Sequence, residues 1–216
     1  MDTKPKLRCI IIVACQSAPV AANVDLRPDD LILCADGGYA RAKAENIRPH
    51  AIIGDFDSLD GRIGESVEKD IQVVRLEKEK DFTDTLECVK YGIARGCGDF
   101  VIVGGLGGRF DHTFANIQTL SFLADMGCGA RIADGKNRAV MVTGAIRLDP
   151  SPGGRFSVYS YEERSVGVNI SGAKYPLTDA VLTQSFPIGV SNEFLGETPV
   201  TVSVKRGRLL IILSED

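Results

Sequence analysis

The first 134 residues of the chain alternate short, almost continuously apolar runs with segments of helical periodicity. The apolar runs are Cys9–Ala14, Leu31–Ala35, Ala51–Gly54, Ile71–Leu76, Phe100–Gly104 and Ala130–Ala133. Runs without polar alternation are typical of parallel strands that are covered by helices on both faces. The segments that favour helices are Gly38–Asn46, Arg62–Lys69, Thr83–Arg95 and His112–Met126. This alternation predicts an α/β domain with a mostly parallel sheet flanked by helices.

The pattern changes near residue 138. Seven short β-type runs follow, at Ala139–Thr143, Ile146–Leu148, Phe156–Tyr159, Val166–Ile170, Ala180–Leu182, Val200–Val204 and Leu209–Leu213. Turn sequences such as PSPGG at 150–154 separate the runs, and no helical periodicity appears among them. Such a pattern is typical of a small all-β sandwich or barrel. We therefore divide the chain into a domain at 1–137 and a second one at 138–216.

Composition excludes several classes of protein. The chain is 44% hydrophobic and 25% charged, with a formal net charge of −4. These values exclude disordered and fibrous chains. The chain also lacks the surplus of basic residues that a non-specific nucleic-acid binder carries. No apolar run reaches the roughly 18 residues of a membrane span, and Cys9–Ala14 is too short for a signal peptide. We expect a cytoplasmic protein with reduced cysteines that binds neither nucleic acid nor membrane.

Aspartates follow four of the predicted strands. They are Asp36, Asp55, Asp57, Asp81, Asp84 and Asp111. Because ligands of a parallel α/β sheet bind beyond the carboxyl ends of its strands, the loops that carry these aspartates are expected to meet at one edge. Gathered carboxylates repel one another unless a cation or bound protons neutralise them. The sequence therefore predicts an acidic site at this edge.

Asp55 and Asp57 are spaced to share a hard cation. Residues two apart in an extended loop can point the same way. Mg²⁺ takes one or two protein carboxylates, keeps several waters and completes its shell with phosphate oxygens. The alternative is that Asp57 caps the helix that follows, while Asp55 lies in a turn. We favour metal binding by the pair, with Asp84 as a further ligand if its loop meets theirs.

The Asp81–Asp84 segment also fits the start of a helix. Asp81 is well placed as an N-cap, and Asp84 resembles the second half of a capping box. Taken alone, Asp81 is predicted to cap the helix. A helix N-terminus also attracts phosphate, so a cap is compatible with a nucleotide nearby.

A glycine-rich loop, Gly104–Gly108, precedes Arg109. Its glycines would let backbone N–H groups approach an anion, and Arg109 would offer a planar fork to phosphate oxygens. The loop matches neither a Walker A sequence nor a dinucleotide fingerprint. It is either a phosphate cradle or an ordinary turn. His112 is either a ligand or base, or a helix-start residue that contacts a neighbour.

Four of these loop sequences, in this order, resemble the thiamin pyrophosphokinase family: DGG at 36–38, GDFDS at 54–58, DFTD at 81–84 and GGRFDH at 107–112. KYPL at 174–177 and GVSNE at 189–193 are similar to the C-terminal signatures of that family. The resemblance implies transfer of a pyrophosphoryl group from ATP to the hydroxyl of thiamin, giving thiamin diphosphate and AMP. It also implies an α/β catalytic domain for ATP and Mg²⁺, a β-sandwich for thiamin and dimerisation, and a homodimer with active sites between subunits.

The resemblance implies roles for single residues. Asp55, Asp57 and Asp84 would hold Mg²⁺ and, with Arg109, would form the catalytic set. Ser191 and Asn192 would help to hold thiamin. The nucleotide and phosphate region would be lined by Asp36, Gly37, Asp81, Thr83, Arg109, Asp111 and His112. Eukaryotic relatives place a tryptophan against thiamin, and this sequence contains no Trp, so Phe, Tyr or an aliphatic residue takes that place.

Two other functions fit the same loops. One is a pyrophosphokinase or nucleotidyl transferase of similar fold that acts on another alcohol, such as a pterin, although GVSNE favours thiamin. The other is a non-catalytic sensor of a nucleotide or of thiamin diphosphate, in which the carboxylates would be dispensable.

Overall fold

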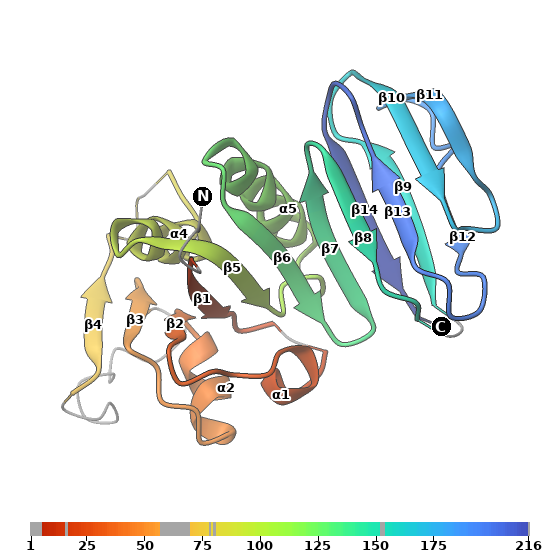
Figure 1. The fold of residues 1–216 in the computed structure, drawn as a ribbon. Coiled ribbons are helices and arrows are strands. Elements are labelled where there is room, and N and C mark those ends of the chain that lie inside the picture. Colours follow the sequence, from red (N-terminus) through yellow and green to blue (C-terminus); the bar gives the residue numbers. More distant parts are fainter. Residues whose placement is uncertain are drawn as a thin grey trace. The chain divides into compact units, whose positions relative to one another are not determined.

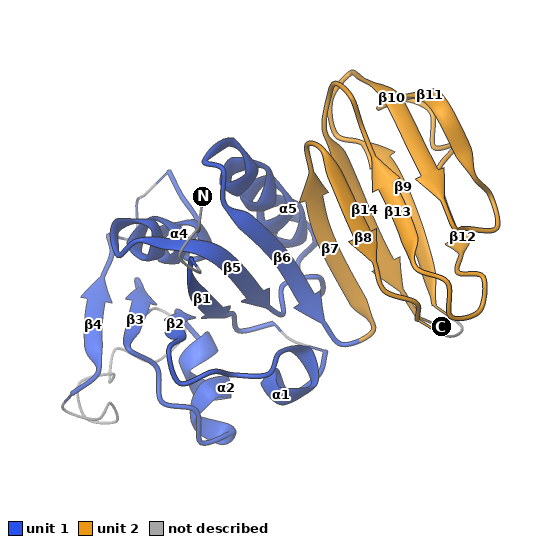
Figure 2. Cartoon of the chain, in the orientation of Figure 1, with its two compact units in different colours: residues 1–135 blue, residues 136–216 orange. Residues whose placement is uncertain are grey.

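The structure is a computed structural model that describes residues 6–15, 17–56, 70–77, 79, 81–151 and 154–215. The chain forms two compact units, residues 1–135 and 136–216 (Figure 2). The first unit is an α/β layer structure and the second is an antiparallel β structure, so the predicted fold class is confirmed. The helix predicted at Arg62–Lys69 lies outside the described residues.

The described residues of the first unit form six parallel strands in the order β6-β5-β1-β2-β3-β4 (Figure 1). Their bounds are Leu7–Ile12 (β1), Leu31–Ala35 (β2), Ala51–Gly54 (β3), Gln72–Arg75 (β4), Cys97–Val103 (β5) and Gly129–Asp134 (β6). From β1 the sheet extends through β2 on one side and through β5 on the other. This reversal of strand order is the point at which an open α/β sheet binds its ligands.

Helices cover both faces of this sheet (Figure 1). They are α1 (Val20–Asn23), α2 (Gly38–Ala44), α4 (Asp84–Ala94) and α5 (Phe110–Asp125). Ile10 and Ile12 of β1 belong to the same buried cluster as Val20 of α1 and Ala42 of α2. Cys9 points to the opposite face, since side chains alternate along a strand, and it lies against Gly92 of α4. The sequence did not predict α1, because a single turn shows no period.

The second unit is a sandwich of two antiparallel sheets. One has the order β12-β9-β14-β7 and the other β11-β10-β13-β8. The bounds are Asn137–Val142 (β7), Ala145–Leu148 (β8), Arg155–Ser160 (β9), Arg164–Ser171 (β10), Leu177–Thr183 (β11), Asn192–Glu193 (β12), Val200–Ser203 (β13) and Leu209–Ser214 (β14). The sequence missed only β12 among these strands, because two residues carry no pattern.

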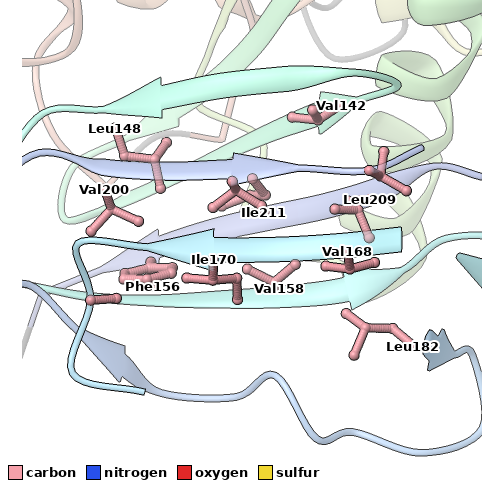
Figure 3. Close-up of a cluster of buried hydrophobic side chains, with 13 residues drawn as sticks. Val142, Leu148, Phe156, Val158, Val168, Ile170, Leu182, Val200, Leu209 and Ile211 are labelled. Atoms are coloured by element: carbon pink, nitrogen blue, oxygen red, sulfur yellow. The ribbon is translucent and has the colours of Figure 1, made fainter. Parts of the chain in front are cut away.

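The core of the sandwich comes from alternate side chains of both sheets (Figure 3). On β9, Phe156 and Val158 are buried, whereas Arg155 is exposed. Val168 and Ile170 of β10, in the other sheet, belong to the same cluster. This alternation between buried and more exposed positions is what a strand with one covered face requires.

Burial also lowers the reactivity of cysteine thiols in this fold. All six thiols are free, and those of Cys9, Cys34, Cys88 and Cys97 are buried. Burial raises the pKa of the Cys34 thiol to about 12. This thiol is therefore protonated near neutral pH and is a poor nucleophile.

No helix in the described part of the chain is long and apolar enough to cross a bilayer.

Candidate active site

A pocket of about 560 Å³ opens at the carboxyl ends of the strands of the first unit. Its walls come from the segments that follow β1, β2, β3 and β5 and from the first turns of α4 and α5. The pocket therefore lies where the strand order reverses, as expected for a ligand site in this kind of sheet.

Six of the predicted site residues line this pocket: Asp36, Asp55, Asp81, Thr83, Asp84 and His112. Four of them are carboxylates, which three separate loops deliver to one cavity. No lysine or arginine stands among the described lining residues. The site is therefore acidic, as the sequence predicts. Asp57 lies outside the described residues, and Gly37, Arg109 and Asp111 are not among the lining residues.

Close backbone packing positions Asp36. Its φ is 42°, and its N–H donates to the carbonyl oxygen of Ile53 over 2.9 Å. A Cβ on Gly54 would lie 2.9 Å from the Cα of Asp36, and a Cβ on Gly38 would lie 2.1 Å from the carbonyl oxygen of Ile12. The glycines of the DGG and GDFDS sequences thus let the ends of β1, β2 and β3 come together.

Thr83 caps α4, so the expectation that Asp81 is the cap is wrong. The Thr83 hydroxyl oxygen accepts a hydrogen bond from the N–H of Leu86 over 3.2 Å. Since the helix begins at Asp84, the cap position falls on the residue before it. Asp84 therefore occupies the first turn, where the helix dipole favours a carboxylate. Asp81 is left exposed at the edge of the pocket.

The sequence allowed the glycine loop to be a phosphate cradle, but its first three residues do not form one. The N–H groups of Gly104, Gly105 and Leu106 donate to the Ala133 carbonyl, the Cys15 carbonyl and Asp134 Oδ2, over 2.8, 2.7 and 3.1 Å. These donors are therefore committed inside the protein. Gly105 of this loop instead forms part of the wall of the pocket.

Two polar residues that the sequence analysis missed hold this wall. Asn116 of α5 is buried, and its amide donates to the Gly105 carbonyl over 3.1 Å. Asp134, at the end of β6, is buried and accepts from the N–H and hydroxyl of Ser17 as well as from Leu106. Asn116 lies one helical turn after His112, and this spacing is the only sequence pattern that points to it.

Arg109 forms an ion pair with Asp111 at 2.6 Å, and both side chains are exposed. The hydrogen bond from Arg109 lowers the pKa of the Asp111 carboxyl. Asp111 Oδ1 also accepts from the His112 N–H over 2.9 Å. The guanidinium therefore lies at the start of α5 and is directed to its own neighbour.

The two predicted thiamin residues belong to the second unit. Asn192 is buried, and its Oδ1 accepts from the N–H groups of Tyr175 and Glu193 over 3.0 and 2.9 Å. Its Nδ2 donates to the Tyr175 carbonyl over 2.7 Å. Ser191 has a φ of 57°, and its N–H donates to the Ser157 hydroxyl over 3.1 Å. Asn192 thus clamps the backbone of Tyr175, whose side chain is exposed.

Oxygen ligands dominate the first-unit pocket, which suits a hard cation. Within the described residues, no group of three or more His, Cys, Asp or Glu side chains is placed to hold a metal ion. Mg²⁺ needs fewer protein ligands than that, since one or two carboxylates suffice when phosphate and water complete its shell. Asp55 and Asp84, from two loops of one cavity, form a donor set of this kind.

Two family models match the chain. The model of the thiamin pyrophosphokinase catalytic domain matches residues 26–129, and that of the vitamin B1-binding domain matches residues 145–209. The chain belongs to the thiamin pyrophosphokinase family. The candidate residues from Asp36 to His112 fall within the first match, and Ser191 and Asn192 fall within the second.

Similar sequences and structures carry the same family name. The thiamine pyrophosphokinase of Bacillus subtilis is 28% identical over 184 residues, which is 84% of this chain and 86% of that protein. Thiamin pyrophosphokinase 1 of Caenorhabditis elegans is 29% identical over 67% of this chain and 62% of its own.

Solved structures of the family share the fold. The crystal structure of the Bacillus subtilis enzyme covers 97% of this chain and 99% of its own, with a TM-score of 0.82 at 24% identity. Yeast thiamin pyrophosphokinase covers 99% of this chain and 87% of its own, with a TM-score of 0.76 at 15% identity. The mixed architecture described above is therefore that of the family.

Proposed function

We propose that this chain is a thiamin pyrophosphokinase that transfers the pyrophosphoryl group of ATP to the hydroxyl of thiamin and releases AMP. One observation carries the proposal. Asp36, Asp55 and Asp84 come from three loops and line one pocket of the unit that matches the catalytic domain of the family. A site that gathers several carboxylates in one cavity suits a metal-bound polyphosphate.

We assign Mg²⁺ to Asp55 and Asp84 of this pocket, and by family resemblance to Asp57. When bound, the ion would offset the charge of the phosphate oxygens and the charge that develops during transfer.

The chain itself contributes alignment. Phosphoryl-type transfer asks for positioning and charge stabilisation and for little covalent chemistry. Asp36 is fixed by its contact with β3, and Asp84 is fixed in the first turn of α4. One of the pocket carboxylates accepts the proton of the attacking hydroxyl. Asp81, Thr83 and His112 line the space for the phosphates.

Arg109 offsets the negative charge on the transferred group in this proposal, and Asp111 of the phosphate region holds the guanidinium until phosphate takes its place. Its ion pair with Asp111 is largely solvent-exposed, with relative side-chain exposures of 73% and 63%. An exposed pair contributes little free energy, so the guanidinium can exchange its partner for a phosphate oxygen at small cost.

The second unit supplies the thiamin-binding residues Ser191 and Asn192. Asn192 acts by holding Tyr175, since the amide makes three hydrogen bonds to the backbone of Tyr175 and Glu193. Tyr175 is an aromatic residue with 55% exposure. We propose that Tyr175 presents the aromatic surface for a thiamin ring in a protein without Trp.

We further propose a cytoplasmic homodimer with active sites at the subunit interface. Light scattering after size exclusion would give twice the chain mass of 23.2 kDa. A monomeric mass under conditions of full activity would contradict this part of the proposal.

The test is a product assay. The purified protein is incubated with ATP, Mg²⁺ and thiamin, and the nucleotides and thiamin esters are separated. We expect AMP and thiamin diphosphate in equal amounts. Formation of ADP, or turnover that does not depend on thiamin, would refute the proposal. Turnover with a pterin alcohol in place of thiamin would favour the alternative substrate.

A further inference from the structure

A second cleft, of about 330 Å³, lies between α4 and α5 and borders the acidic pocket. The two cavities share Asp81, Phe82 and Thr83 in their linings. A ligand whose charged end occupies the acidic pocket can therefore extend into the cleft past these three residues. The volume of the cleft falls in the range of sites for small organic ligands.

The walls of the cleft are mostly apolar. Phe82, Leu86, Ala115 and Phe122 line it. The Phe82 ring is 49% exposed, and the ammonium of Lys90 lies 3.4 Å from its centroid. Aromatic and aliphatic surfaces of this kind suit a flat heteroaromatic ring, because every nucleobase has a face that stacks on aromatic side chains. The walls therefore favour a base over a sugar or a phosphate.

Gln118 is the polar group that can select among bases. Its side chain is exposed on the wall of the cleft, and no described residue hydrogen-bonds its amide. The neighbouring Thr119 hydroxyl donates to the Ala115 carbonyl over 2.9 Å, so its proton is committed to the helix. A glutamine amide offers a donor and an acceptor side by side. This pair matches N7 and the N6 amino group of adenine, whereas guanine presents two acceptors there.

We propose that the cleft between α4 and α5 binds the base of the nucleoside triphosphate and that Gln118 makes the site prefer adenine over guanine. The inference deepens the proposed function and rests on its use of ATP. Asp81 and Thr83, which line both cavities, then mark the passage from base to phosphates.

Binding without turnover tests this proposal. ADP, GDP and inorganic tripolyphosphate are titrated by calorimetry into the full chain with Mg²⁺ present. Gln118→Leu removes the amide at similar volume, and Phe82→Ala removes an exposed ring. Gln184→Leu, an exposed glutamine of the second unit, is the matched control. Circular dichroism checks that each variant is folded.

We expect Gln118→Leu to reduce the preference for ADP over GDP by roughly tenfold, the effect of one lost bidentate contact. Phe82→Ala should weaken ADP and GDP alike, by about tenfold, through lost stacking. Tripolyphosphate should bind all four proteins equally, since it has no base.

The outcomes separate the two proposals. Unchanged ADP and GDP affinities in both folded variants would overturn the cleft assignment alone. Normal ADP binding by a protein that forms no thiamin diphosphate would overturn the proposed function and leave the base site standing. A wild-type chain that binds neither ADP nor GDP would overturn both.

Discussion

Gly54 and Asp36 approach so closely that a methyl group on Gly54 would lie 2.9 Å from both Cα and Cβ of Asp36. The end of β3 therefore packs directly on the turn that follows β2, where Asp36 adopts a φ of 42°. A non-glycine residue at positive φ needs support from its surroundings. The Asp36 N–H bond to Ile53 supplies part of that support. The geometry of the acidic pocket thus depends on a residue that carries no side chain.

Gly54→Ala should lower both activity and stability. The added methyl has no room against the backbone of Asp36, and overpacking of this kind costs about 1–3 kcal/mol. We expect a clear fall in kcat, because Asp36 must move, together with a lower midpoint in urea unfolding. Gly144→Ala is the control, since its Cβ would meet nothing within 4 Å. Full activity of Gly54→Ala would show that the position of Asp36 is unimportant.

The stability of two alanine variants should show that Thr83, and not Asp81, caps α4. Thr83→Ala deletes the oxygen that accepts from Leu86 and should lower the free energy of unfolding by about 1 kcal/mol. Thr83→Ser keeps that oxygen and should restore most of the loss. Asp81→Ala should leave stability nearly unchanged, because Asp81 does not cap the helix. A larger loss for Asp81→Ala than for Thr83→Ala in urea unfolding would contradict the assignment.

The clamp on Tyr175 should govern affinity for thiamin. Asn192→Ala leaves the N–H and carbonyl of Tyr175 without their partner and should cost about 1–3 kcal/mol of stability. We expect a raised KM for thiamin with an unchanged KM for ATP. Tyr175→Ala should give the same kinetic change, and Tyr175→Phe should give little.

Asn169→Ala provides the control for the clamp. Asn169 also bonds backbone groups of the second unit, those of Gly167 and Asp179. Its loss should lower stability without a change in KM for thiamin. If Asn169→Ala and Asn192→Ala raise that KM equally, the effect is general loosening of the sandwich, and the clamp has no specific role.

The buried ion pair between Arg8 and Asp30 should make the free energy of unfolding depend on pH in the acidic range. Arg8 Nε and Nη2 donate to the two carboxylate oxygens of Asp30, each over 2.7 Å. Burial raises the pKa of Asp30, but the hydrogen bonds from Arg8 and the Arg27 N–H outweigh it and lower the pKa below its usual 3.8. A carboxyl with a lowered folded-state pKa stabilises the fold fully above its unfolded pKa, and this contribution is lost as the pH falls through the folded-state pKa.

Asp30→Asn should therefore cost about 3–5 kcal/mol near neutral pH, because it leaves Arg8 buried without a charged partner. The gap from wild type should narrow as the pH falls below about 4. Urea unfolding at a series of pH values measures both quantities. Asp179→Asn, in an exposed pair with Lys205, should show only a small gap. A gap for Asp30→Asn that is constant with pH would contradict the assigned pKa.

Local pattern sufficed for the main elements of the fold. The predicted strands Leu31–Ala35 and Ala51–Gly54 match β2 and β3 residue for residue, because a polar residue stands directly before and after each apolar run. The convergence of Asp36, Asp55 and Asp84 also followed from the sequence, since parallel strands place their carboxyl ends at one edge.

Contacts between distant residues could not be predicted. Asn192 and Tyr175 are 17 residues apart, and Leu106 and Asp134 are 28 apart. No periodicity encodes such pairs, so the clamp and the committed N–H groups of the glycine loop appear only in the structure. The choice between Asp81 and Thr83 as cap depends on where the helix begins, and sequence patterns define such boundaries only within a few residues.

The role of the pocket carboxylates is tested most directly by the turnover of Asp55→Asn and Asp84→Asn at saturating Mg²⁺, ATP and thiamin. The amide keeps the size of each side chain and removes its charge. We predict a loss in kcat of at least about 100-fold in each variant, with cooperative unfolding retained. The reason is that the carboxylate charge holds the cation, and the cation offsets the negative charge of the transferred group. Near-normal turnover of either folded variant would contradict the account.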